Sequence, residues 1–324
     1  MCTAVSFQSR DHYFGRNLDL SYSYHESVAV TPRRYPLRFR KASTLDNHLA
    51  MIGMAYVKDG FPLYYEATNE KGLSMAGLNF PQTAVYREET AGMDNVTPFE
   101  LIPWLLAQCA TVAQARPLLA RLNVLNLPFS DELPLSPLHW MLADAQEAIV
   151  LEPHAEGLRI HENAIGVLTN EPAFPTHLDA LRSYLHLTPN EPNNAFAPAL
   201  ALTPTSLGLG ALGLPGDASS TSRFVRAAFT LHNSRRGEGE NESVSQFFHI
   251  LNSVRVPKGF VRLDNGKDHL TIYSSCCNTA KGVYYYTTHD NSQPTAVDMH
   301  RTDLDGSNVT AYPMLTDTRI HWQN

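Results

Sequence analysis

The sequence lacks long apolar runs and clusters of basic residues, and each absence excludes a class of protein. No stretch of about 18 apolar residues occurs, so the chain is not expected to cross a membrane. At most two basic residues are adjacent, as at Arg33-Arg34, and the formal net charge of the 324 residues is -7. Nucleic acid is therefore not an expected partner.

Cysteine is also scarce. The four cysteines, Cys2, Cys109, Cys276 and Cys277, include no C-x-x-C pair, and the 14 histidines include no H-E-x-x-H spacing. The glycine-rich stretch at 208–213 follows no buried strand, so it is not a dinucleotide fingerprint. We therefore expect no disulfide scaffold, no metal and no cofactor. The start of the chain lacks the basic residues and apolar run of a secretory signal, which predicts a cytoplasmic enzyme.

Short apolar runs with alternating or β-branched residues predict many strands, and runs with helical spacing predict five helices. The expected strands are Thr3-Phe7, Ser27-Thr31, Ala50-Val57, Leu63-Ala67, Leu73-Leu78, Leu138-Ala143, Ala148-Glu152, Leu158-His161, Leu270-Cys276, Gly282-Thr288 and Thr295-Met299. The expected helices are Phe99-Cys109, Val112-Leu122, Thr176-Leu187, Ser222-His232 and Val244-Val254. The strands and helices do not alternate regularly, which favours an α+β fold with antiparallel sheets. No linker divides the chain, so we predict one domain over 1–324.

The segment 188–217 is rich in proline, asparagine, alanine, glycine and leucine, and it is long for a loop inside a compact domain. Such segments are usually functional or interfacial. Its apolar side chains predict an oligomerisation segment, unless the segment folds back over its own core. These side chains are Phe196, Leu200, Leu202, Leu207, Leu209, Leu212 and Leu214.

Cys2 is the first candidate for chemistry. Removal of Met1 before a small residue leaves a thiol and a free α-amino group on one residue, which places nucleophile and base together. A small buried cysteine at a strand start is the structural alternative. Arg16 and Asp19 follow. Arg16 would favour a thiolate and Asp19 would hold an ammonium, although both reach one site only if the strand bends, for which Gly15 offers a place.

Three further polar residues are candidates. Asn79 and Asn170 each follow a strand-like run and precede a proline, and their side-chain N–H groups are suited to an oxyanion, whereas turn formation is the alternative. Arg223 lies in the first turn of an expected helix, where the helix dipole disfavours a cation. A carboxylate or an anionic site must therefore compensate it, unless Arg223 is simply solvated.

Together these residues lie within motifs that run from end to end of the chain. The motifs are Met1-Cys2-Thr3, FGRNLDL at 14–20, NEKGL…AGLNFP at 69–81, PLHW at 137–140, VLTNEP at 167–172, GLPGD…SSTSRF at 213–224 and YSSCCN…KGVYYY at 273–286. In these motifs and their order the chain resembles the choloylglycine hydrolases, which comprise bile salt hydrolases and penicillin V acylases.

The resemblance implies a four-layer αββα fold of the N-terminal-nucleophile hydrolases, with two stacked antiparallel sheets, and amide hydrolysis through a thioester. It assigns catalytic roles to Cys2, Arg16, Asp19, Asn79, Asn170 and Arg223. It assigns the lining of an apolar substrate pocket to Leu18, Leu20, Phe61, Tyr65, Phe129, Leu133 and Leu138. It also implies subunit packing through 188–217, and we expect a homotetramer.

Asn79 resembles the bile salt branch of the family, because the penicillin V branch commonly carries tyrosine at that position. Conjugated bile salts of the glycocholate or taurocholate type are the expected substrates. A penicillin V acylase and a non-catalytic binding protein of the same fold are the alternatives. Glu171 stands next to Asn170, where relatives in the family often have serine, asparagine or glutamine. We expect its negative charge to affect the binding of an anionic substrate.

Overall fold

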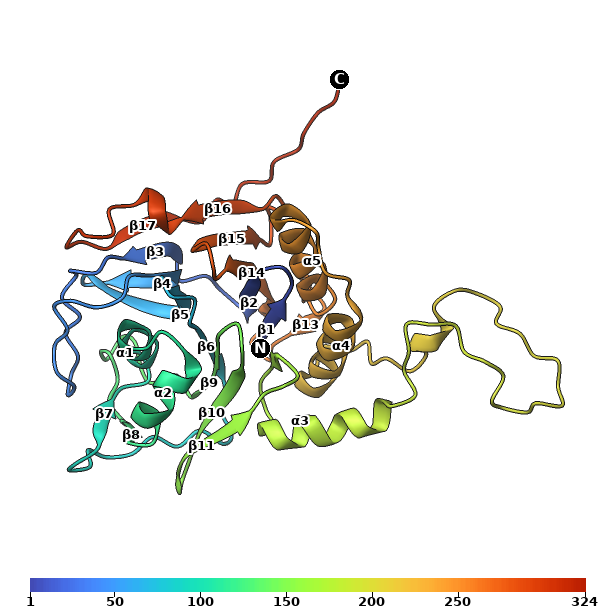
Figure 1. The fold of residues 1–324 in the computed structure, drawn as a ribbon, viewed down its shortest axis with the longest axis horizontal. Coiled ribbons are helices and arrows are strands. Elements are labelled where there is room, and N and C mark those ends of the chain that lie inside the picture. The colour runs from blue at the N-terminus through green and yellow to red at the C-terminus, as the bar shows by residue number, and fades with distance from the viewer.

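Two antiparallel sheets stack face to face, and helices cover the two outer faces (Figure 1). The computed structural model describes residues 1–324. Helices α4 and α5 pack on the first sheet, and α1 packs on the second. One apolar core fills the space between the sheets and extends beneath α4 and α5, and another lies between the second sheet and α1 with α2. This is the expected αββα arrangement.

The first sheet, sheet A, contains the first motifs of the chain, in β1 and β2, and the last, in β14 and β15. Its order is β12-β1-β2-β14-β15-β16, and the short β13 pairs with β14. Its strands are β1 (Cys2–Gln8), β2 (His12–Leu20), β12 (Val167–Leu168), β13 (Val261–Arg262), β14 (Asp268–Asn278), β15 (Val283–Thr288) and β16 (Thr295–Asp298).

The second sheet, sheet B, has the order β11-β10-β9-β6-β5-β4-β3-β17. Its strands are β3 (Ser27–Thr31), β4 (Met51–Lys58), β5 (Phe61–Asn69), β6 (Ser74–Asn79), β9 (Leu138–Ala143), β10 (Ala148–His154), β11 (Gly157–Glu162) and β17 (Thr310–Pro313). A separate parallel pair joins β7 (Asp94–Val96) and β8 (Leu122–Val124).

The helices follow the apolar periodicity of the sequence. They are α1 (Leu101–Gln108), α2 (Val112–Leu119), α3 (Phe174–Leu181), α4 (Ser220–Asn233) and α5 (Glu240–Asn252), and 3₁₀ turns occupy Arg182–Tyr184, Leu209–Ala211 and Met299–Arg301. Helix α3 is shorter than expected, because the chain tightens into the 3₁₀ turn at Arg182. None of these helices has the length and apolar character needed to cross a bilayer.

Strand β2 is straight, which overturns the bend expected at Gly15. Its register with β1 is unbroken from Cys2 opposite Leu18 to the far end of the hairpin. The irregularity lies on β14 instead, between Thr271 and Tyr273. Gly15 meets a different requirement, because a Cβ there would lie 2.0 Å from the carbonyl oxygen of a β14 residue. Side chains three apart on β2 therefore leave opposite faces of sheet A.

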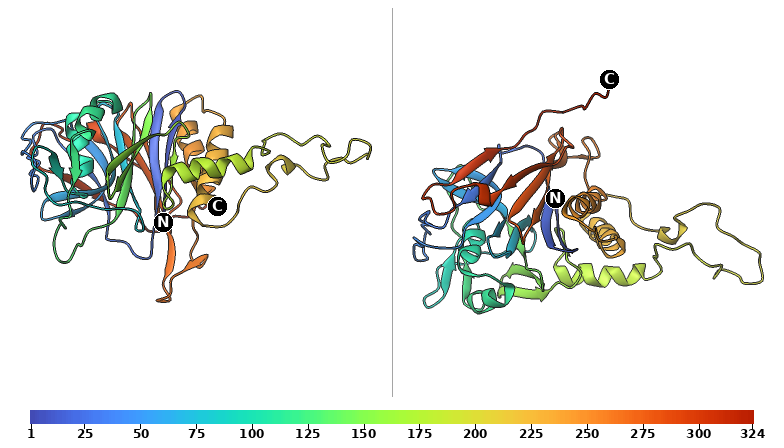
Figure 2. Two further views of the ribbon diagram at one scale, coloured as in Figure 1. Left: turned by 90° about the horizontal axis from the view of Figure 1, so that it is seen from below. Right: turned by 45° about the horizontal axis from the view of Figure 1, so that its top comes forward.

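The segment between α3 and α4 projects away from the body of the protein (Figure 2). Most of its apolar side chains are not folded back onto the core, since Phe196 is 87% exposed and Leu207 is 91% exposed, whereas Leu209 and Leu214 are half-buried. Leu200, Leu202 and Leu212 are exposed as well. The alternative in which the segment covers its own core is therefore wrong.

The buried His12 predicts a fall in stability on acidification. Its ring nitrogens lie 2.8 Å from the Ser6 hydroxyl and 3.0 Å from the Thr279 hydroxyl, and burial lowers the pKa of His12 to about 4. The unfolded chain binds the proton near pH 6.5, so the contribution is present above that pH and is lost as the pH falls toward 4. We expect His12→Gln to remove about 2–3 kcal/mol of the fall in unfolding free energy between pH 7 and 4.5.

Urea unfolding at the two pH values measures this difference. The matched control is His249→Gln, because His249 is exposed on α5. It should keep the pH dependence of the unmodified protein. An unchanged pH dependence in His12→Gln would contradict the prediction.

Candidate active site

Cys2 lies at the start of β1 and is almost fully buried, with 3% of its surface exposed. It faces sheet B and lines a cavity of about 390 Å³. Its backbone nitrogen donates a hydrogen bond to Oδ1 of Asn170 at 2.7 Å. Because Met1 is present, this nitrogen is a peptide amide. It stands where the α-amino group of Cys2 lies once Met1 is removed.

Asn170 connects Cys2 to the other layers of the fold. Its Oδ1 also accepts from Nη2 of Arg223 at 2.7 Å, and its Nδ2 donates to the carbonyl oxygen of Asn79 at 2.9 Å. Asn170 follows β12 of sheet A, Asn79 ends β6 of sheet B, and Arg223 lies in α4. The structure thus brings these four residues together from three layers.

The guanidinium of Arg223 is fully buried and has neutral partners only. It donates to the backbone oxygens of Cys2 and Ala218 and to Oγ1 of Thr3 at 2.7 Å, in addition to Asn170. No carboxylate forms an ion pair with Arg223, and the buried guanidinium is not solvated, so of the three alternatives only an anionic site stays a prediction. Burial lowers the pKa of Arg223, while the charges of Asp19 and the Cys2 thiolate act in the opposite direction. Because its hydrogen-bond partners are neutral, the positive charge of Arg223 can stabilise a thiolate at Cys2.

Arg16 approaches Cys2 from the opposite side, between the sheets. Its Nη1 donates to the carbonyl oxygens of Tyr65 at 3.2 Å and Gly77. These carbonyls are free because the pairing of β5 with β6 ends at Glu66 and Ala76. Burial lowers the pKa of Arg16, but the nearby negative charges, that of the Cys2 thiolate first among them, outweigh it and leave the pKa above its ordinary value.

Glu66 is a buried partner of Arg16 that sequence reasoning missed. Its Oε2 lies 3.9 Å from Nε of Arg16, and its carboxylate accepts from the hydroxyls of Tyr273, Ser275 and Tyr284. Burial raises the pKa of Glu66, although Arg16 and the hydroxyl donors oppose the rise. The sequence signal that could have identified Glu66 is its position as a carboxylate inside the apolar strand-like run 63–67.

Asp19 lies on the other face of β2, beside the backbone of the first residues. Its Oδ1 accepts from the Thr271 hydroxyl at 2.6 Å, and its buried Oδ2 has no hydrogen-bond partner. The Met1 amine contacts the carbonyl oxygen of Asp19 at 3.0 Å and Nε2 of His269 at 2.7 Å. Burial lowers the pKa of this amine. The two faces of β2 therefore have different surroundings: Arg16 lines the same cavity as Cys2, and Asp19 lies beside Met1.

The cavity beside Cys2 is mostly apolar and opens where β5 and β6 part. Of the residues expected to bind substrate, Leu18, Leu20, Tyr65, Phe129, Leu133 and Leu138 line it, and so do Asn79 and Arg16. Phe61 does not line it. The Phe61 ring packs edge-on against Phe99, a lining residue, with centroids 6.2 Å apart. The tyrosines Tyr22, Tyr24 and Tyr56 also line the cavity and were not foreseen.

A cysteine at the start of a central strand, inside an αββα sandwich, defines the class of N-terminal-nucleophile hydrolases. Comparison with known proteins agrees and is more specific. The family model of the linear amide C-N hydrolases, choloylglycine hydrolase family, matches residues 2–312. The chain belongs to this family.

Two relatives cover nearly the whole chain. The chain is 51% identical over 324 residues, all of both chains, to the bile salt hydrolase/transferase of Lactiplantibacillus plantarum. It is 36% identical over 317 residues, or 96% of both chains, to the bile salt hydrolase/transferase of Clostridium perfringens.

Solved structures show the same fold. A variant of the conjugated bile acid hydrolase from Clostridium perfringens superposes with a TM-score of 0.92 at 35% identity and covers 100% of both chains. The penicillin V acylase from Agrobacterium tumefaciens gives a TM-score of 0.76 at 19% identity, covering 96% of this chain and 90% of that one. The latter likeness concerns the fold alone.

The four thiols differ in their expected reactivity. Burial raises the pKa of Cys109 to about 11 and that of Cys277 to about 12, so both remain protonated near neutral pH. We expect Cys2→Ser to lower kcat/KM for amide hydrolysis by about 10³-fold or more, because a hydroxyl is far less acidic than a thiol. Steady-state turnover and circular dichroism of the purified variant measure the loss and the retention of the fold.

The control for this prediction is Cys109→Ala, which should keep turnover. The intact mass of the active protein should lack Met1, since an α-amino base exists only then. Full activity with Met1 retained would refute the α-amino base. Loss of activity on modification of Cys277 but not Cys2 would show that Cys2 is not the nucleophile.

Proposed function

We propose that this protein hydrolyses the amide bond of glycine- or taurine-conjugated bile acids. One observation carries the proposal: Cys2 and Arg16 line a mostly apolar cavity of about 390 Å³. A steroid acyl group needs an apolar pocket with few polar anchors. The names of the relatives, bile salt hydrolase/transferase and conjugated bile acid hydrolase, support this substrate class.

The reaction begins with attack of the Cys2 sulfur on the amide carbonyl. The α-amino group of Cys2 accepts the thiol proton, directly or through water, and returns it to the leaving glycine or taurine amine. Water then hydrolyses the thioester and releases the bile acid. The two buried guanidinium groups favour the thiolate at the start of this cycle.

The other polar groups bind the charges that develop. The Asn79 side chain, with a backbone N–H, donates to the tetrahedral oxyanion. Asn170 and Asp19 orient the α-amino group, Asn170 through the 2.7 Å contact at the Cys2 nitrogen and Asp19 through its unpaired Oδ2. Arg16 acts on the sulfur, and Arg223 balances the charge of the pocket. No metal or cofactor takes part in this proposal.

Comparison of three substrates tests the function. We expect turnover of glycocholate and taurocholate, with kcat/KM at least about 10-fold above that for penicillin V, because the differential apolar contact of the steroid is worth a few kcal/mol. Mass spectrometry of the released acid and amine measures each reaction. Preference for penicillin V would indicate an acylase, and binding of bile salts without turnover would indicate a binding protein.

We propose further that the protein is a homo-oligomer, with a tetramer as the expected state. The support is the projecting segment 188–217, whose exposed Phe196, Leu207 and Leu212 form no contact with the body of the protein that buries them. Monomers rarely leave such apolar surface in water. An arm exchanged between subunits gives a closed, self-complementary contact. The cytoplasmic location expected from the sequence stays a prediction.

Deletion of residues 190–206 tests the role of the segment. We expect the mass measured by light scattering to fall, because the apolar contacts are removed, while Cys2 chemistry is at least partly retained. The control is Leu185→Ser, which replaces one exposed leucine outside the segment and should leave the mass measured by light scattering unchanged. An unmodified protein that is monomeric at micromolar concentration would refute the proposal.

A further inference from the structure

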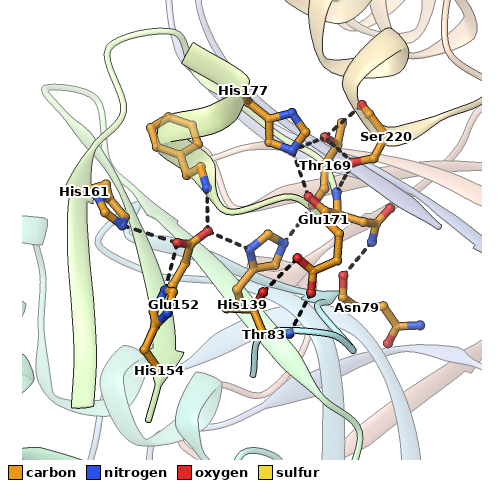
Figure 3. Close-up of polar contacts among 12 residues, drawn as sticks. Asn79, Thr83, His139, Glu152, His154, His161, Thr169, Glu171, His177 and Ser220 are labelled. Atoms are coloured by element: carbon orange, nitrogen blue, oxygen red, sulfur yellow. Dashed lines mark hydrogen bonds and ion pairs between the residues drawn. The ribbon is translucent and has the colours of Figure 1, made fainter. Parts of the chain in front are cut away.

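The carboxylate of Glu171, next to Asn170, is bound by the loop that follows Asn79 (Figure 3). Its Oε1 accepts from the backbone N–H groups of Gln82 at 2.8 Å and Thr83 at 3.0 Å, and its Oε2 accepts from the Thr83 hydroxyl at 3.0 Å. Glu171 does not line the cavity. The carboxylate is directed at the chain itself, and its expected effect on an anionic substrate stays a prediction.

A second carboxylate, that of Glu152 in β10, holds both ends of the segment that carries Asn170 (Figure 3). At one end, the Phe174 N–H donates to Oε1 of Glu152 at 2.8 Å. At the other end, the His139 ring lies between Glu152 and the Thr169 carbonyl oxygen, at 3.4 Å and 2.8 Å. The segment 169–174 is thus fixed at its first and last residues by one fully buried group.

Glu152 is a charged centre and not a metal ligand. Burial alone would raise its pKa, but hydrogen bonds from His139 and the Phe174 N–H, together with His154, hold the pKa below its ordinary value. His154 and His161 contact its Oε2 at 3.4 Å and 3.3 Å. No group of histidines and carboxylates in the structure is arranged to hold a metal ion. The cluster therefore acts as an anchor made of hydrogen bonds and ion pairs.

The Asn79 loop meets the Asn170 segment directly at two places, and a third contact runs through His139 of β9. Nδ2 of Asn170 donates to the Asn79 carbonyl oxygen at 2.9 Å. The Phe80 ring stacks on the His139 ring with centroids 4.2 Å apart and an angle of 6°. The Glu171 carboxylate supplies the other direct link. Of these links, only Glu171 joins the outer part of the Asn79 loop to the segment, so its loss frees residues 81–83 from the anchored side.

We propose that Glu171 is a positioning residue for the oxyanion-binding side of the reaction. It holds the Asn79 loop against the anchored segment 169–174, so that the Asn79 amide stays directed at the carbonyl that Cys2 attacks. A donor stabilises an oxyanion only when it is aligned before the charge develops, and small displacements are costly. This inference rests on the proposed function for the identity of the substrate, and on the geometry for the role of Glu171.

Two substitutions at Glu171 separate positioning from charge. Glu171→Ala removes all three hydrogen bonds, and we expect kcat for glycocholate to fall by about 10- to 100-fold while KM stays within about twofold, because the apolar cavity is untouched. Glu171→Gln retains an oxygen for the two backbone N–H groups, and its amide donates to the Thr83 hydroxyl, which rotates to accept. We expect it to restore kcat to within about threefold of the unmodified protein.

Two controls accompany these variants. Glu156→Ala removes an exposed carboxylate on the β10–β11 turn and so changes the net charge equally, and kcat and KM should both stay unchanged. The alkylation rate of Cys2 by iodoacetamide should also stay unchanged in Glu171→Ala, because that reaction forms no oxyanion. A merely structural role would lower this rate together with turnover.

The outcomes are distinct. Full kcat in Glu171→Ala would overturn the inference, and so would a Glu171→Gln variant as slow as Glu171→Ala, or a change confined to KM. If the unmodified protein cleaves penicillin V but neither bile salt, the proposed function fails. The same variants are then compared on penicillin V with the same expectations, since every amide passes through an oxyanion.

Discussion

The side-chain amide of Asn170 is the contact on which the geometry of the site depends. It accepts from the Cys2 nitrogen and from Arg223, and it donates to the Asn79 carbonyl oxygen. These partners come from sheet A, helix α4 and sheet B. An unpaired buried polar group costs about 1–3 kcal/mol, so the layers have one relative arrangement in which every bond of this amide forms. Its neighbours in 169–174 are fixed from outside by Glu152.

Electrostatics at Cys2 depend on how each buried charge is solvated by the protein. Arg223 is surrounded by neutral oxygens, and the carboxylate nearest Arg16, Glu66, has a raised pKa because it is buried. Neither guanidinium is therefore fully neutralised by a carboxylate. Inside the sandwich, where the effective dielectric constant is low, that excess positive charge favours a thiolate over a thiol. Cys276 and Cys277, buried without such neighbours, have raised pKa values.

The cavity lies beside a break in the pairing of sheet B, since Tyr65 and Gly77, just beyond the last pair of β5 with β6, line it. Strands β5 and β6 separate beyond Glu66 and Ala76, and the carbonyls released there bind Arg16. One local departure from regular pairing thus anchors Arg16 beside the mostly apolar cavity. The straight β2 strand then presents Arg16 to the cavity that Cys2 lines and Asp19 to the opposite face of sheet A.

The sequence by itself determined the α+β class and most elements, such as β1 and α4, because apolar periodicity records which face of a strand or helix is buried. The sequence also offered Cys2 as a candidate nucleophile. The roles of Cys2, Arg16, Asn79 and Arg223 came only from the family resemblance, since each residue alone had an ordinary alternative. Tertiary structure alone decided the straight course of β2, the place of Phe61 behind the cavity lining, and the partners of Glu66, Glu152 and Glu171. Those partners lie between 2 and 218 residues away in sequence, and the distant ones become neighbours only in the folded chain.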